Sequence, residues 1–130
     1  FKMILKIHEV LALQKFYNKL SKQELPIRLN YKLTKLYKNI ESDFEFYRTR
    51  MTEIINIYGL KDDNGQFILT DNSAEVKIQP DKVNECQDKI NELMNLETSE
   101  LPILKLKLDE LDNISLTMQE MAILEPFIEE

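Results

Sequence analysis

Residues 33–58 read LTKLYKNIESDFEFYRTRMTEIINIY and set the architecture of this chain. The large apolar side chains recur at alternating spacings of four and three residues without a break, which places them on one face of a helix. They are Leu33, Tyr37, Ile40, Phe44, Tyr47, Met51, Ile54 and Tyr58. Pro26 suits a first helical turn, and Gly59 stands where a left-handed residue commonly ends a helix. The pattern predicts one helix over residues 26–58, roughly 50 Å long.

Two shorter helical patterns flank this segment. Over residues 8–22 the apolar residues recur at spacings of three, four and three, at Val10, Leu13, Tyr17 and Leu20. Pro80 begins a second pattern over residues 80–96, with the same spacing at Val83, Cys86, Ile90 and Leu93. The position of Cys86 in this repeat indicates a small buried core residue.

A last helix is indicated near the end of the chain. Thr117 followed three residues later by Glu120 has the form of a capping box. We expect a short helix over residues 118–125, ended by Pro126.

The segment after Gly59 has β character. Asn64-Gly65 is a tight-turn dipeptide, because both residues tolerate positive φ. Two β-prone runs follow, Phe67–Thr70 and Glu75–Ile78, with turn residues 71–73 between them. They predict a hairpin over residues 66–79. Since an isolated hairpin is marginal in water, it should pack on the helices or gain a third strand, from residues 2–7 or 103–108.

The long apolar face of this helix must be shielded from water by other segments of the chain or by a second copy. The segments 8–22 and 80–96 together reach about 48 Å end to end, which matches the long helix. The alternative is a coiled coil between two copies of the chain. Tyrosines on the apolar face favour the cover within one chain, because each hydroxyl must reach water or a partner. A homo-oligomer through some remaining surface stays open.

These features predict an α+β fold that is mostly α. One long central helix is packed by two shorter helices, with a small antiparallel β-hairpin or sheet and a short C-terminal helix. We expect a single domain over residues 1–130. Its parts are a helical part (8–58), the β-hairpin (66–79), a helix (80–96) and a C-terminal strand and helix (103–130).

Composition limits the class of protein. The chain has 130 residues, 43% of them apolar, and a formal net charge of −6. No apolar run approaches the roughly 20 residues that span a bilayer, and no signal peptide is recognisable, so we expect no membrane association.

The residues available for chemistry are few. The chain has one cysteine, Cys86, and one histidine, His8. They cannot supply the four ligands of a structural zinc site. The acidic run before Gly65 does not fit a calcium loop, because Leu60 would occupy the first ligand position. We therefore expect no metal, no cofactor and no catalytic residue, and a protein that is not an enzyme.

The net charge hides two halves of opposite sign. Residues 1–58 carry +5 and residues 59–130 carry −11. A candidate interaction face lies on the back of the long helix, formed by Arg28, Tyr31, Lys32, Lys35 and Lys38. This face could bind phosphate or an acidic protein, or its charges could be neutralised by the acidic half of the same molecule. The second interpretation is favoured, and nucleic-acid binding is the less expected role.

The acidic half has two interpretations as well. Its candidate face consists of Asp81, Glu85, Asp88, Glu92, Asp109, Glu110 and Asp112. Such a surface can mimic nucleic-acid phosphates and block a basic protein, or it can simply keep the chain soluble.

Several segments occur in an order that resembles a known group. They are Leu25-Pro26-Ile27-Arg28, Tyr31-Lys32-Leu33, Ile40-Glu41, Tyr58-Gly59-Leu60-Lys61-Asp62-Asp63-Asn64-Gly65, Val76-Lys77-Ile78 and Leu124-Glu125-Pro126-Phe127-Ile128-Glu129-Glu130. The chain thus resembles small uncharacterised proteins of tailed bacteriophages and prophages. The resemblance implies a viral protein in the host cytoplasm or the virion, with an accessory or assembly role.

Three functional hypotheses follow. The first is a non-enzymatic phage protein that acts by protein–protein contact, as a virion component or assembly factor. The second is an inhibitor of a host defence or host enzyme, acting through the acidic half by nucleic-acid mimicry. The third is a nucleic-acid-binding accessory protein that uses the basic helix face.

Overall fold

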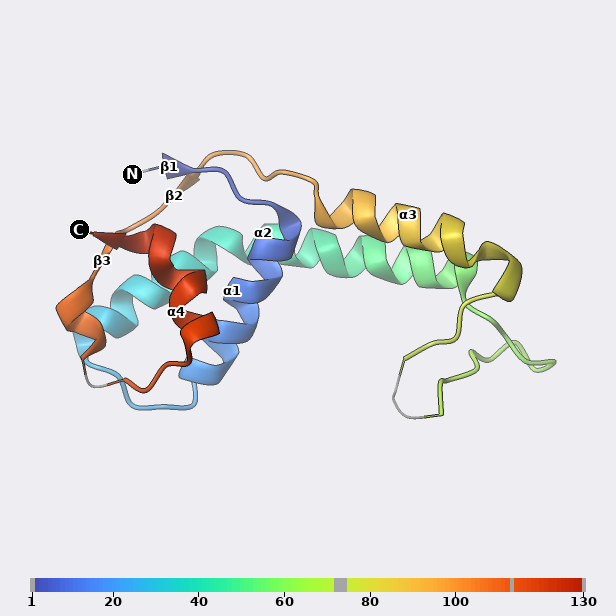
Figure 1. Cartoon of the computed structure of the whole chain (residues 1–130), viewed down its shortest axis with the longest axis horizontal. Coiled ribbons are helices and arrows are strands. Elements are labelled where there is room, and N and C mark those ends of the chain that lie inside the picture. Colours follow the sequence, from blue (N-terminus) through green and yellow to red (C-terminus); the bar gives the residue numbers. More distant parts are fainter. Residues whose placement is uncertain (1, 72–74, 113, 130) are drawn as a thin grey trace. The chain divides into compact units, whose positions relative to one another are not determined.

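The computed structural model describes residues 2–71, 75–112 and 114–129 (Figure 1). The chain divides into two compact units. The first unit contains Phe1–Phe44 and Glu97–Glu130, and the second contains Glu45–Leu96. The predicted α+β class with a long helix is confirmed. The expectation of a single domain stays a prediction.

The long helix α2 extends over Ile27–Tyr58, as the apolar spacing predicted. No glycine or proline interrupts it, and Pro26 directly precedes its first residue. The boundary between the two units falls within α2, after Phe44. The first half of this helix therefore belongs to one core and the second half to another.

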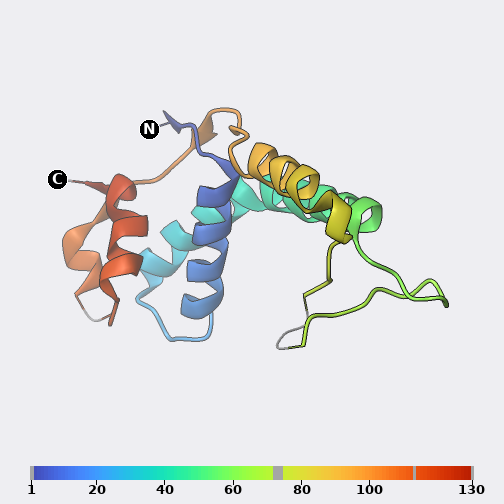
Figure 2. The ribbon, with the colours of Figure 1, turned by 45° about the vertical axis from the view of Figure 1, so that its right-hand side comes forward.

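In the first unit, α1 (Ile7–Leu20) crosses the first half of α2 (Figures 1 and 2). Two clusters of buried side chains form the core of this unit. One contains Leu5, Val10, Leu13, Leu36, Ile40, Leu101, Ile103 and Phe127. The other contains Phe16, Leu20, Leu29, Leu33, Leu106, Leu111 and Leu124. The cover within the chain that was expected for this half of the apolar face is thus observed.

The strands of the first unit are short, and each end of the chain pairs with part of the segment 101–107. The strand β1 (Lys2–Met3) is antiparallel to β2 (Leu101–Pro102), and β3 (Leu106–Lys107) is parallel to β4 (Ile128–Glu129). Thr98 reinforces the first pairing, because its Oγ1 accepts a hydrogen bond from the Leu5 N–H at 3.1 Å. Among the described residues neither segment pairs with the hairpin, so the two suggested sources of a third strand were wrong.

The C-terminal part adds the 3-10 turn η2 (Leu108–Leu111), the helix α4 (Met118–Leu124) and the 3-10 turn η3 (Glu125–Phe127). The predicted capping box is confirmed. Thr117 Oγ1 accepts from the Glu120 N–H at 3.2 Å, and Glu120 Oε1 accepts from the Thr117 N–H at 2.9 Å.

In the second unit, the 3-10 turn η1 (Pro80–Lys82) leads into α3 (Val83–Met94), which lies antiparallel along the second half of α2 (Figures 1 and 2). Cys86 and Leu93 are buried, as their spacing predicted. Val83 is exposed, which corrects its expected place in the core. It is the first residue of α3, directly after η1.

The hairpin of the second unit is built from isolated antiparallel bridges, which pair Leu69 with Val76, Lys61 with Phe67 and Gly59 with Ile78. Its third strand is the segment 59–61 directly after α2. The 62–65 turn is confirmed at Gly65, whose φ is +79°. The expected 71–73 turn falls largely outside the described residues.

Gly59 does not have the left-handed conformation that was expected of it, since Gly65 is the described residue with positive φ. A different constraint requires glycine at this position. A Cβ on residue 59 would lie 2.6 Å from the carbonyl oxygen of Ile55 and 2.6 Å from the Phe67 ring. Gly59 therefore allows the hairpin to fold back closely against the end of α2.

Candidate functional site

A groove runs along the second unit between its two helices. It has a volume of about 380 Å³. From α2 it is lined by Phe46, Arg50, Glu53, Ile54 and Ile57, and from α3 and the residues after it by Lys89, Glu92, Leu93 and Leu96. We call these nine residues the arm groove.

The arm groove is apolar and open because two helices cover each other on only one side. In the first unit the apolar face of α2 is buried at Leu33 and Ile40, where α1 and the C-terminal segment pack on it. In the second unit that face reaches only intermediate burial from Tyr47 to Ile55.

Large apolar side chains of the arm groove consequently face solvent. Phe46 is 39% exposed, Leu96 is 46% exposed and Ile57 is 62% exposed. Contiguous apolar surface that is edged by charged residues is typical of protein-binding sites.

The charges at the edges of the arm groove alternate in sign. On α2, Arg50 precedes Glu53, and the two form an ion pair of 2.7 Å between Nη1 and Oε2. The Arg50 guanidinium also lies over the Phe46 ring, 5.2 Å from its centroid. On α3, Lys89 precedes Glu92. The groove thus has two basic and two acidic residues at its edges and no net charge.

Sequence reasoning missed the arm groove. Phe46, Ile57 and Leu96 lie outside the apolar spacings that predicted the helices. The available signal was the pair Phe46 and Ile57, which lie beside the main stripe, next to its member Ile54.

The predicted basic face lies on α2 in the first unit, and one of its members is used internally. Lys32 Nζ lies 2.7 Å from Glu110 Oε1, with side chains only 17% and 11% exposed. This pair agrees with the interpretation that basic and acidic charges neutralise each other within the molecule. Lys35 lies over the Tyr31 ring, 5.7 Å from its centroid, and Arg28, Lys35 and Lys38 are exposed.

The pair changes the protonation of Glu110. The hydrogen bond from Lys32 is the main cause that holds the pKa of Glu110 below its usual value of 4.5, although burial acts in the opposite direction. The Lys107 N–H and the charge of Arg28 add to the lowering. Glu110 is thus held ionised by cations of the predicted basic face.

The predicted acidic residues are divided between the units. Asp81, Glu85, Asp88 and Glu92 are exposed along η1 and α3 of the second unit. Asp109, Glu110 and Asp112 belong to η2 and its end in the first unit. The two groups are therefore separate features, and Glu110 forms an ion pair with Lys32.

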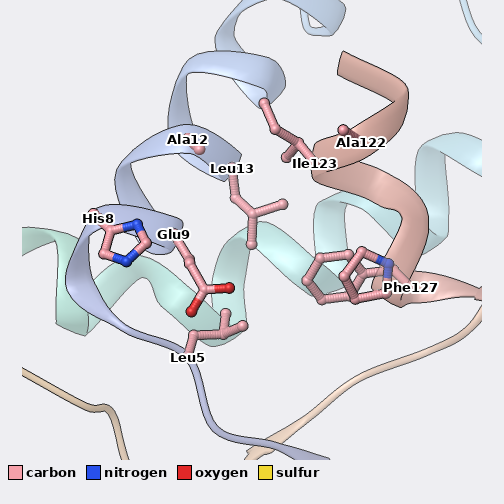
Figure 3. A pocket seen from close by; sticks show the side chains of 9 residues that line it. Leu5, His8, Glu9, Ala12, Leu13, Ala122, Ile123 and Phe127 are labelled. Carbon is pink, nitrogen blue, oxygen red and sulfur yellow. The ribbon is translucent and has the colours of Figure 1, made fainter. Parts of the chain in front are cut away.

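The first unit has a pocket of about 280 Å³ between α1 and the segment α4–η3 (Figure 3). Leu5, Ala12, Leu13, Ala122, Ile123 and Phe127 make most of its wall, with His8 and Glu9 at its polar side. Glu9 Oε1 accepts the Lys6 N–H at 2.9 Å and so caps the start of α1. The Glu9 carboxylate of this pocket therefore serves the local fold.

Across the described ranges, no three His, Cys, Asp or Glu side chains are grouped so that they could hold a metal ion. None of the helices in the described ranges is both long and apolar enough to span a membrane. Burial raises the pKa of the Cys86 thiol, which keeps it protonated.

Residues 2–103 match the family described as "Protein of unknown function (DUF1617)", and the chain therefore belongs to this family. The match contains the whole second unit with the arm groove, whereas α4 and η3 follow its end. Neither the curated proteins nor the solved structures gave a significant match.

Proposed function

We propose that this DUF1617 protein is a non-enzymatic phage protein that acts by protein–protein contact, as a virion component or assembly factor. The arm groove is the observation that carries this proposal. It offers a partner an apolar floor and charged edges on a pair of helices.

The physical support is the free energy available from covering the groove. Full burial of a large apolar side chain is worth about 1.5–3 kcal/mol. Much of this free energy is still to be gained at Phe46, Ile57 and Leu96 when a partner covers them, because a large part of each side chain is in water. Phe46 and Ile57 lie on the regular helix α2, which limits the entropy lost on binding, since its backbone is already ordered.

The viral context is supported by the sequence resemblance to proteins of tailed phages and prophages. That resemblance supports a location in the host cytoplasm or in the virion. A virion component would be present in purified particles, whereas an assembly factor would be bound to structural proteins in infected cells.

The test uses the tagged full chain and an Ile57→Asp variant. Mass spectrometry of purified particles and of pull-downs from infected cells should show the protein with a phage structural protein, and Ile57→Asp should reduce that association. Leu108→Asp is the matched control, because Leu108 is 60% exposed but belongs to the first unit and is not one of the nine groove residues. Association that is absent, or equal in all three proteins, would contradict the proposal.

A second candidate is the inhibition of a host defence or host enzyme through the acidic half. The supporting observation is the exposed row Asp81, Glu85, Asp88 and Glu92, which repeats at four, three and four residues along η1 and α3. Lysine replacements at Asp81 and Asp88, which lie outside the arm groove, should abolish inhibition in an interference assay. Unchanged inhibition would exclude this role for the row.

A further inference from the structure

We propose that the occupant of the arm groove is the arm groove of a second copy, so that the protein forms a twofold homodimer through its second unit. This inference rests on the proposed protein-binding role of the groove. It adds the identity of one partner, which the pattern of charges specifies.

Because α2 and α3 are antiparallel, the charged residues that lie opposite each other across the groove can be found by counting along the two helices. The Tyr58 side chain at the end of α2 interacts with the Glu85 side chain near the start of α3. Counting back along α2 and forward along α3 from this contact, Arg50 lies within one residue of the level of Glu92, and Glu53 within one residue of the level of Lys89. Each base is therefore followed by an acid along its helix, and each faces an acid across the groove.

This alternation makes the surface complementary to itself. If a second copy is turned by half a rotation about an axis along the helices, Arg50 meets the Glu92 of the other copy and Glu53 meets its Lys89. An axis across the helices instead brings Arg50 to Glu53 and Lys89 to Glu92. In both cases every charge meets one of opposite sign, as an isologous interface requires.

The arrangement of the apolar residues in the arm groove is compatible with the same twofold rotation. Ile54 and Leu93 lie in the middle of the groove, whereas Phe46 and Ile57 lie toward its two ends. A twofold rotation stacks the middle of one groove on the middle of the other and covers the exposed side chains. A partner with a strong net charge would be repelled by half of the groove's edges, whereas a second copy is attracted by all of them.

The first test is analytical ultracentrifugation of the purified full chain over a range of concentrations. We expect a reversible dimer with twice the chain mass of 15.4 kDa. Ile57→Asp should weaken dimerisation about tenfold or more, because it places a charge on an apolar surface that the dimer would bury. Leu108→Asp should leave dimerisation unchanged, and circular dichroism should show that each variant remains helical.

A charge exchange tests the pattern itself. Arg50→Glu with Lys89→Glu makes the groove edges acidic, and Glu53→Lys with Glu92→Lys makes them basic. We expect each double variant alone to be monomeric and their equimolar mixture to form a heterodimer. Failure of the mixture to associate would overturn the proposal.

The proposed function and this inference can fail separately. A wild-type chain that stays monomeric at all concentrations overturns the homodimer. The broader role survives that result if Ile57→Asp still removes a phage structural protein from the pull-down. A dimer that is insensitive to both Ile57→Asp and the charge variants also overturns the inference.

Discussion

Lys32 Nζ lies 2.7 Å from Glu110 Oε1 and joins the first half of α2 to η2. The Lys107 N–H donates to the same carboxylate oxygen at 2.9 Å. The second oxygen, Oε2, is buried and has no hydrogen-bond partner in the described part of the chain. Because little water reaches this carboxylate, the charge of Glu110 depends on Lys32.

Removing Lys32 should therefore destabilise the first unit. We expect Lys32→Met to lower the free energy of unfolding by about 2 kcal/mol, because it leaves a largely buried carboxylate without its cation. The double variant Lys32→Met/Glu110→Leu should lose less than the sum of the single variants. Urea unfolding measures both, and Lys35→Met is the control on the same helix, with an expected change below about 0.5 kcal/mol. Equal losses at Lys32 and Lys35 would contradict the structural role of the pair.

The ion pair between Lys32 and Glu110 should also make the free energy of unfolding depend on pH in the acid range. The folded pKa of Glu110 lies below its usual 4.5, so its contribution is fully present above pH 4.5 and is lost as the pH falls through the folded value. The difference in unfolding free energy between wild type and Glu110→Gln should shrink below pH 4.5. The pKa of Glu120 is also lowered, by Lys19, but Glu120 is present in both proteins and its contribution cancels in the difference. A difference that stays constant with pH would show that Glu110 titrates normally.

Gly59 should tolerate no side chain. We expect Gly59→Ala to cost about 1–3 kcal/mol, because the Cβ would overlap the Ile55 carbonyl, which belongs to the α2 backbone and cannot move freely. Gly65→Ala should cost only about 1 kcal/mol, since its Cβ meets open space and the penalty comes from φ alone. Thermal unfolding of the two variants gives the comparison. A Gly59→Ala protein as stable as wild type would contradict the close approach of the hairpin to α2.

The Tyr58 hydroxyl should lose its proton at a higher pH than an ordinary tyrosine. Burial, and then the charge and hydrogen bond of Glu85, raise the pKa of Tyr58 above its usual 10.0. Since the tyrosinate is disfavoured in the folded state, stability is unaffected by Tyr58 below pH 10 and decreases above it. Alkaline titration by ultraviolet absorbance should show one tyrosine with a raised pKa, which moves down in Glu85→Gln. No movement in that variant would show that Glu85 does not contact the hydroxyl.

The local features of this fold were predictable from the sequence. The helix α2 follows from its uninterrupted apolar spacing, the start of α4 follows from Thr117 and Glu120, and the 62–65 turn follows from Gly65. Each depends on residues that are close together in the chain. Their physical causes, which are periodicity, capping and positive φ, act over a few residues.

The remaining features depend on contacts between distant segments. Lys2 pairs with Pro102, and Lys32 pairs with Glu110, although nothing near either residue specifies its partner. The apolar spacing of α2 indicated which face needs a cover but not how completely α3 covers it. For that reason the long stripe was predicted and the arm groove beside it was not.

The arm groove can be tested most directly by placing a photoreactive cross-linking residue at position 57 in the purified full chain. We expect illumination to join two copies covalently through segments 46–57 or 89–96, identified by mass spectrometry of the digested product. The same residue at position 108 should give no such product. No cross-linked dimer from position 57, or equal yields from both positions, would contradict the groove as the surface that binds a second copy.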